Sequence, residues 1–257
     1  MISPILSYAC DNCNIFLNIN PNDYQHSIGI QSRSRLHYGN FDNSRLLLLK
    51  HGGGDAMEFY NSVVTELYNR VELTGRYFIN NKWNIQGVLP YVSNQQIVNG
   101  YGKYSVNGLG DPMVIQNYQV FNSKNLSDSI IFTHRLTVGA GVKLPLGQID
   151  KTYALGTPNL DLQPGTGSWD GIFTLTYLAK IKQVGIILNG NYKLNGRNVN
   201  SFQYGNTTNA LASLFYQLKI KEIVVMPSIG IYAEIAGYDK SNKESDFKSG
   251  GELYFAD

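Results

Sequence analysis

The sequence lacks a long hydrophobic run. Nowhere in its 257 residues is there a stretch of about 18 apolar residues, the length that a transmembrane helix requires. The sequence also lacks a large excess of either sign of charge, because the net charge is +2 and only 16% of the residues are charged. These absences exclude a helical membrane span and the basic surface typical of nucleic-acid-binding proteins. We therefore expect no nucleic-acid partner.

Residues suited to strands and turns are abundant: 26 Gly, 18 Tyr and 11 Phe. Apolar and polar residues alternate with a period of two, which is the pattern of a β-strand with one apolar face. A helix competes over Tyr60–Val71, but the alternation continues to Ile79 and favours a strand, with a short helix or loop left open for Ala56–Ser62. The predicted strands are Ser27–Tyr38, Glu66–Tyr77, Lys82–Ser93, Met113–Phe121, Phe132–Leu144, Gly171–Ile181, Val184–Lys193, Ala210–Ile220, Ile223–Ile235 and Gly250–Ala256.

The links between these strands alternate in length, apart from a medium link near Asn122–Ser129. The short links are Asn80–Lys82, Lys182–Gln183 and Lys221–Glu222, and the long ones are Gly39–Asp55, Asn94–Asn107, Gly147–Ser168, Leu194–Thr208 and Gly237–Ser249. Outer-membrane barrels have short periplasmic turns and longer extracellular loops. The predicted fold class is therefore all-β: an antiparallel, up-and-down transmembrane β-barrel of about 10–12 strands in the cell outer membrane.

Aromatic residues lie near the ends of the predicted strands, where the interfacial girdles of such a barrel belong. They are Tyr77, Phe78, Trp83, Tyr91, Tyr118, Phe121, Trp169, Tyr192 and Tyr238. A soluble β-sandwich also alternates and is the main structural alternative. The barrel is favoured because Arg, Glu and Lys occupy the face opposite the apolar one in most strands.

Three local motifs resemble a known family. They are Gly108–Pro112 before one strand, Gly139–Gly147 at the end of the next, and Asn159–Asp170 at the start of another. Together they resemble the outer-membrane barrel family usually labelled "transporter", which is related to the MetA-pathway phenol-degradation barrels of Gram-negative bacteria. The resemblance implies an outer-membrane barrel with a passage or uptake role and implies no particular substrate. Members of that family continue to an aromatic-ended last strand, so the end at Tyr254–Asp257 suggests a C-terminal truncation.

The N-terminus carries both cysteines, Cys10 and Cys13. Small residues at Ser7 and Ala9 match a signal-peptidase site, so we expect 1–9 to be a signal-peptide remnant, 10–22 a periplasmic segment and 23–257 the barrel domain. Cys10 and Cys13 are expected to form a disulfide or remain as thiols, with metal binding as the alternative. A zinc site would need two further ligands, and His26 and His37 are the only nearby imidazoles. No other cofactor is expected.

The polar face of the predicted strands carries the candidate lumen residues. They are Arg33, Arg35, Glu66, Arg70, Glu72, Arg76, Arg135, Lys143, Lys193, Lys219 and Glu234. Two interpretations remain open: a polar plug whose charges satisfy one another, or a constriction that selects small polar or anionic solutes.

No catalytic site is expected. His134 lies on an apolar strand face with no serine two residues away on that face, so an interfacial histidine is favoured over a lipid hydrolase. Asp111, Asp161 and Asp170 are separated by long segments and form no visible carboxylate pair. Gly52–Gly54 lacks the strand–loop–helix context of a phosphate cradle and is expected to be a surface loop.

Three functions fit this sequence. The first is a porin-like or uptake barrel for a small polar or aromatic solute in the lipid bilayer of the outer membrane. The second is a non-conducting barrel that docks a periplasmic partner through Cys10–Asn22. The third is a soluble, ligand-binding β-barrel.

Overall fold

The computed structural model describes residues 25–40, 63–125, 131–149, 162–221, 223–240 and 253–256. The expectations for Cys10, Cys13, Gly52–Gly54 and Ala56–Ser62 lie outside these ranges. Within them, no helix has both the length and the apolar character needed to cross a membrane.

The described chain is almost entirely β-structure, as the alternation predicts. The strands are β1 (Ser27–Asn40), β2 (Val63–Phe78), β3 (Trp83–Val98), β4 (Tyr101–Leu109), β5 (Met113–Asn122), β6 (Phe132–Lys143), β7 (Asp170–Ile181), β8 (Val184–Asn195), β9 (Thr207–Tyr216), β10 (Leu218–Ile220), β11 (Ile223–Val225), β12 (Ser228–Ala236) and β13 (Leu253–Ala256), with a 3₁₀ turn, η4, at Ser123–Asn125.

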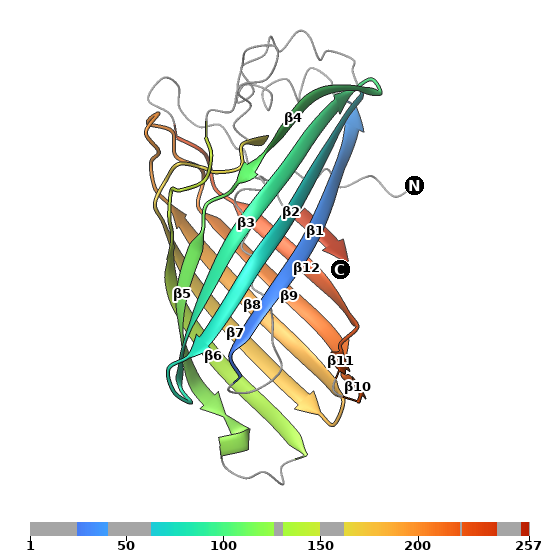
Figure 1. The fold of residues 1–257 in the computed structure, drawn as a ribbon, viewed down its shortest axis with the longest axis vertical. Coiled ribbons are helices and arrows are strands. Elements are labelled where there is room, and N and C mark those ends of the chain that lie inside the picture. The colour runs from blue at the N-terminus through green and yellow to red at the C-terminus, as the bar shows by residue number, and fades with distance from the viewer. Residues whose placement is uncertain are drawn as a thin grey trace.

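These strands form one strongly curled antiparallel sheet (Figure 1). Eleven strands belong to it, in the order β1-β2-β3-β5-β6-β7-β8-β9-β12-β13 with β4 also paired to β3, while β10 and β11 make a separate hairpin. The curl brings β1–β3 in front of β7–β12 in Figure 1. The predicted antiparallel barrel of about 10–12 strands is confirmed. Among the described residues no ladder joins β1 to β13, so the wall is open there.

The strands β4 and β5 together act as one long, interrupted strand. The upper part of β3 pairs with β4, from Tyr91 opposite Leu109 to Val98 opposite Tyr101, and its lower part pairs with β5, from Trp83 opposite Tyr118 to Val88 opposite Met113. The interruption falls at residues 110–112, opposite Leu89 and Pro90. Because β6 pairs with β5 and not with β4, the sheet branches at this interruption.

The outer face of the sheet is apolar and exposed. Ile30 is 76% exposed and Ile231 is 66% exposed, and similar side chains follow on every long strand. The inner face buries polar and charged side chains, among them Glu72, Gln96 and Lys193. Such a large exposed apolar surface is unlike that of a soluble monomer and matches a barrel that faces lipid.

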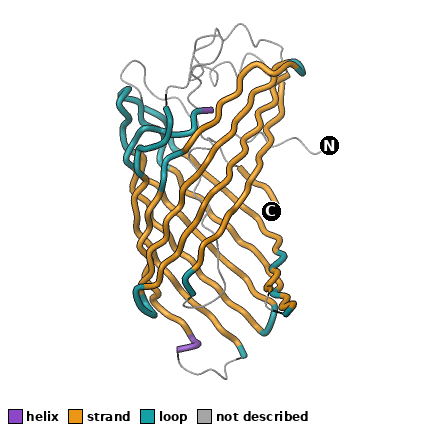
Figure 2. The backbone as a smooth tube through the Cα atoms, viewed as in Figure 1, coloured by secondary structure: helices purple, strands orange, loops and turns teal. Residues whose placement is uncertain are grey.

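The two ends of the sheet differ (Figure 2). We call the end with the turns 79–82 and 182–183 the turn end, and the end with the links 144–169 and 196–206 the loop end. At the turn end, outward aromatic rings pack in pairs: Trp83 with Tyr118 at 4.6 Å between centroids, and Phe121 with His134 at 4.6 Å. This arrangement is that of an interfacial girdle.

Three predictions of local structure are wrong. The predicted long link Asn94–Asn107 contains the end of β3 and most of β4, joined by a tight turn in which Asn99 and Gly100 have φ of 52° and 82°. The predicted strand Ile223–Ile235 is broken into β11 and β12 around Pro227, which has no N–H to continue a ladder. Likewise β9 ends at Tyr216, before the hairpin β10–β11 begins.

Candidate functional site in the barrel interior

Ten of the eleven candidate lumen residues lie on the inner face of the sheet. They are Arg33, Arg35, Glu66, Arg70, Glu72, Arg76, Arg135, Lys143, Lys193 and Glu234. The prediction for Lys219 is wrong, because this residue belongs to β10, where it is exposed outside the eleven-stranded sheet. A role of the other ten in a solute path remains a prediction.

The three motifs that carried the family resemblance meet at Asp111, in the interruption between β4 and β5. One carboxylate oxygen of Asp111 accepts a hydrogen bond from the Gly147 amide at 2.9 Å. The other accepts from the Thr166 amide at 2.8 Å and from Lys143 Nζ at 2.7 Å. Asp111 therefore ties the loop-end link after β6 to the branch point of the sheet.

The protonation of Asp111 reflects these contacts. Burial by itself raises the pKa of this carboxyl group, but the charge of Lys143, its hydrogen bond and the amides of Thr166 and Gly147 outweigh that effect and hold the pKa below the usual value. The ionised form of Asp111 is thus the form that the junction stabilises.

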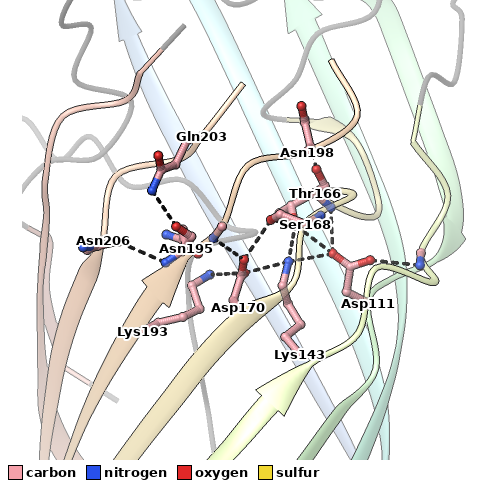
Figure 3. A network of polar contacts seen from close by, with 12 residues as sticks. Asp111, Lys143, Thr166, Ser168, Asp170, Lys193, Asn195, Asn198, Gln203 and Asn206 are labelled. Atoms are coloured by element: carbon pink, nitrogen blue, oxygen red, sulfur yellow. Dashed lines mark hydrogen bonds and ion pairs between the residues drawn. The ribbon is translucent and has the colours of Figure 1, made fainter. Parts of the chain in front are cut away.

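A buried row of alternating charges continues from Asp111 along the inner face (Figure 3). Lys143 Nζ lies 2.7 Å from Asp111 Oδ2 and 2.8 Å from Asp170 Oδ2, and Lys193 Nζ lies 4.0 Å from the same Asp170 oxygen. All four side chains are at most 5% exposed. The prediction that Asp111 and Asp170 form no carboxylate pair is wrong, because both carboxylates bind the amine of Lys143. Asp161 lies outside the described residues.

Glycine permits the close backbone contact at this junction. A Cβ on Gly147 would lie 2.6 Å from the carbonyl carbon of Gly110 and 2.7 Å from the Asp111 amide nitrogen. Atoms at such distances overlap, so a side chain at Gly147 would push the link away from the branch point.

Residues 162–168, which we call the inward segment, reach across the interior from this junction. Leu162 is fully buried against Tyr68 of β2 and Val106 of β4, and its carbonyl accepts a hydrogen bond from Asn94 Nδ2 of β3 at 3.0 Å. Thr166 and Ser168 are also buried, and Ser168 Oγ donates to Asp170 Oδ1 at 2.8 Å. The inward segment therefore narrows the loop end of the barrel interior.

The neighbouring link between β8 and β9 is hydrogen-bonded to the inward segment and to Asp170. Asn198 Nδ2 donates to the Thr166 carbonyl at 3.2 Å, and the Gly196 amide donates to Asp170 Oδ1 at 3.0 Å. Within that link, Gln203 Nε2 donates to the Asn195 carbonyl at 2.7 Å (Figure 3). Two loop-end links thus share the same buried carboxylate.

Charges also pair on the wall formed by β1, β2 and β12. Arg70 Nε lies 2.5 Å from Glu72 Oε1, and the hydroxyl group of Tyr232 donates to Glu234 Oε2 at 2.5 Å. Arg33 and Arg35 of β1 interact electrostatically with Tyr232 of β12. These polar side chains therefore lie near the open edge of the wall, where β1 and β13 are the outermost strands.

Between these charged regions the inner face is lined by amides. Asn117 Nδ2 donates to Asn84 Oδ1 at 3.0 Å, and Asn191 Nδ2 donates to Asn209 Oδ1 at 2.7 Å. Asn189 Nδ2 donates to Thr176 Oγ1 at 2.7 Å. These cross-strand hydrogen bonds stabilise the sheet without adding net charge to the interior.

Metal ligands do not gather in the described ranges, where no group of three or more His, Cys, Asp or Glu side chains could hold an ion. Disulfide formation or metal binding at Cys10 and Cys13 remains a prediction, because both residues lie outside those ranges.

Comparison with known proteins supports the barrel fold. A crystal structure of an outer membrane channel from Pseudomonas putida F1 is similar, with a TM-score of 0.52 and 13% sequence identity, covering 87% of this chain and 79% of that one. A search of curated proteins found no match. Residues 49–256 match the family described as "Putative MetA-pathway of phenol degradation". The chain therefore belongs to this family.

Proposed function

We propose that this protein is a channel of the outer membrane that passes a small polar or aromatic solute. The observation that carries the proposal is the division of the curled sheet into an apolar outer face and a polar inner face, narrowed at one end by the inward segment. Lipid can cover the first face, and water and solute can occupy the space along the second.

Solvent access to the inner face supports passage. At the turn end, inward side chains such as Arg76, Arg135 and Thr176 are half-buried, whereas Lys143 and Thr166 at the loop end are buried. Half-buried polar side chains at the turn end lie beside a buried apolar cluster of Leu178, Ile187 and Phe215, and the interior is closely packed where the inward segment crosses. We infer that the inward segment is the constriction that limits solute size.

The proposal gives the protein no enzymatic activity. His134, considered above as a catalytic histidine, packs between the rings of Phe121 and Phe132, with Tyr177 at 6.3 Å. That environment favours a place in the aromatic girdle. The alternative of a barrel that docks a periplasmic protein depends on Cys10–Asn22, outside the described residues, and remains a prediction.

Conductance of the full-length protein in planar bilayers tests the proposal. Folding is first verified by detergent extraction from the outer-membrane fraction and by a gel shift between unheated and boiled samples. We expect discrete, voltage-independent conductance steps that are small for a barrel of this size. A silent bilayer containing verified, folded protein would rule out the channel and favour the docking alternative.

A further inference from the structure

The hairpin of β10 and β11 continues the β9–β12 strand pair beyond the eleven-stranded sheet (Figure 1). The β9–β12 ladder ends at the turn end with Ser228 opposite Phe215. The hairpin ladder begins three residues further along each strand, with Val225 opposite Leu218, so the register is unchanged. The hairpin is therefore an extension of this strand pair, interrupted where Pro227 cannot donate to the ladder.

The neighbouring strands end before the hairpin begins. On one side, β8 starts at Val184, opposite Tyr216, and on the other side β13 pairs only with Ile231–Glu234 of β12. The segment Leu218–Lys221 thus extends about 13 Å past the end of β8. Among the described strands, none pairs with β10 or β11 apart from each other.

One face of the hairpin is aliphatic. Residues directly opposite each other in an antiparallel ladder share a face, and so do alternate residues along one strand. The side chains on this face, all of them exposed, are Leu218, Ile220, Ile223 and Val225. Ile223 is 66% exposed, as much as Ile231 in the middle of the wall.

The aliphatic face points outward, toward lipid. Gln217 lies on the inner side, because its Oε1 accepts a hydrogen bond from Lys180 Nζ at 2.9 Å. Met226 lies on the inner side too, because it packs against the buried cluster that contains Phe215. Leu218 follows Gln217 directly and therefore projects from the opposite side. The aliphatic face is thus continuous with the apolar outer face of the barrel.

Exposed lysines surround the hairpin. The turn 182–183 between β7 and β8 adjoins it, because the amide of Gln217 donates to the carbonyl of Gln183 at 2.8 Å. The exposed lysines of the hairpin and this turn are Lys182, Lys219 and Lys221. The same two segments contain a single acidic residue, Glu222, which lies outside the described residues. Their sequence therefore carries net positive charge beside an apolar surface.

We propose that the β10–β11 hairpin binds anionic phospholipid in the membrane leaflet at the turn end. Acyl chains cover its aliphatic face, since that face continues the lipid-facing wall, and the lysines bind the phosphate groups of the lipid. Apolar area combined with cations is how interfacial segments bind anionic membranes, and long lysine side chains extend from apolar surfaces to the headgroups. A protein partner fits less well, because the hairpin has no aromatic residue, the type enriched in protein interfaces.

Quenching of tryptophan fluorescence by brominated lipids tests this site in vesicles. Ile220→Trp places a tryptophan on the aliphatic face, in a background of Trp83→Phe and Trp169→Phe. The matched control in the same background is Leu175→Trp, on the outer face of β7. We expect brominated phosphatidylcholine and brominated phosphatidylglycerol to quench both tryptophans. At position 220 the phosphatidylglycerol should bind at least about threefold more tightly than the phosphatidylcholine, and at position 175 the two should be equal.

The lysines are tested by the double variant Lys219→Gln/Lys221→Gln. It should remove the preference for phosphatidylglycerol at position 220, as should about 1 M salt. Its matched control is Lys82→Gln/Lys240→Gln, which removes two exposed lysines elsewhere on the barrel and should retain the preference.

Thermal unfolding in detergent gives a second measurement that needs no introduced tryptophan. Added phosphatidylglycerol should raise the midpoint of the wild type and of Lys82→Gln/Lys240→Gln more than phosphatidylcholine does. The variant Lys219→Gln/Lys221→Gln should show equal shifts with the two lipids. In detergent without lipid its midpoint should match the wild type, because the hairpin lies outside the eleven-stranded sheet.

The outcomes separate this proposal from the channel proposal, which does not depend on it. A tryptophan at position 220 that neither brominated lipid quenches overturns the proposal, and its protection from acrylamide would indicate a protein occupant instead. Equal binding of the two lipids at position 220 overturns the anionic site. A silent bilayer together with the lysine-dependent lipid preference removes the channel and supports the lipid site.

Discussion

At the loop end of the interior, Lys143 and Lys193 are buried beside Asp111 and Asp170, whereas at the turn end Arg76 and Lys180 are half-buried and donate to glutamine side chains. The same residue types thus occupy the inner face under two different conditions. Buried charges must be paired, since an isolated one costs several kcal/mol, so the loop-end lysines hold the inward segment in place. The turn-end cations Arg76 and Lys180 are less deeply buried than the loop-end lysines. The buried ion pairs of the loop end fit the polar-plug interpretation, and a selective constriction remains a prediction.

The variant Lys143→Met should have the largest effect on the stability of the loop end. It leaves Asp111 and Asp170 buried without their shared cation, and we expect a loss of about 3–5 kcal/mol in the free energy of unfolding. Urea unfolding in detergent micelles measures the loss, with Lys219→Met as the control. If the two variants were equally stable, the buried charge row would not hold the loop end.

The variant Asp111→Asn should loosen the inward segment with less damage, by about 1–3 kcal/mol, because Asn retains the shape but not the charge. The wild type should show a matching response to acid. Since the folded pKa of Asp111 is depressed, its contribution is complete above the ordinary carboxyl value of about 3.9 and is lost as the pH falls through the folded value.

The protein's two tryptophans, Trp83 near the turn end and Trp169 beside Asp170, allow the acid response to be located. In single-tryptophan variants made with Trp83→Phe or Trp169→Phe, acid should change the fluorescence of Trp169 before that of Trp83. Asp111→Asn should remove this difference. Simultaneous changes at both positions would point to unfolding of the whole barrel instead.

The variant Gly147→Ala tests the close backbone contact at the junction. The added Cβ overlaps the backbone of Gly110 and Asp111, and we expect a loss of about 1–3 kcal/mol together with increased conductance. Gly190→Ala is the matched control, because a Cβ there meets no atom within 4 Å. Equal stability of the two variants would contradict the tight junction.

The smallest effect is expected at the turn end, from His134→Ala. This variant removes one ring from the girdle of Phe121, Phe132 and Tyr177, which should cost about 0.5–1.5 kcal/mol. The measurement is the thermal midpoint, accompanied by hydrolysis of a fluorogenic lipid ester. Ester hydrolysis by the wild type that the variant loses would contradict the structural role of His134.

The alternation of apolar and polar residues alone is enough to predict most strands of the barrel wall. In β6, for example, Arg135 and Lys143 were assigned to the polar face, and both lie inside. The hairpin β3–β4 was missed because its Asn, Gln and Gly content is typical of a loop. The pair Asn99-Gly100 is nevertheless a strong hairpin signal, since both residues take positive φ.

The junction at Asp111 could not be predicted, for a geometric reason. Alternation indicates which face a residue occupies but not its height along the barrel, which depends on the register of each ladder. Asp111 meets Lys143 only because β5 and β6 pair with Met113 opposite Lys143. The path of the inward segment has no periodicity at all, and the one signal for it was the density of Gly, Pro and Thr in Leu162–Asp170.

The contacts of Asp111 also bear on the order of folding. Its partners Gly147 and Thr166 follow it by 36 and 55 residues, so these contacts can close only after β5, β6 and β7 lie side by side, and closing such long loops slows their formation. The barrel should therefore insert into the membrane with a wide opening at the loop end. The inward segment should narrow this opening in the last step of folding. During refolding into lipid vesicles, Trp169 fluorescence should then lag behind that of Trp83.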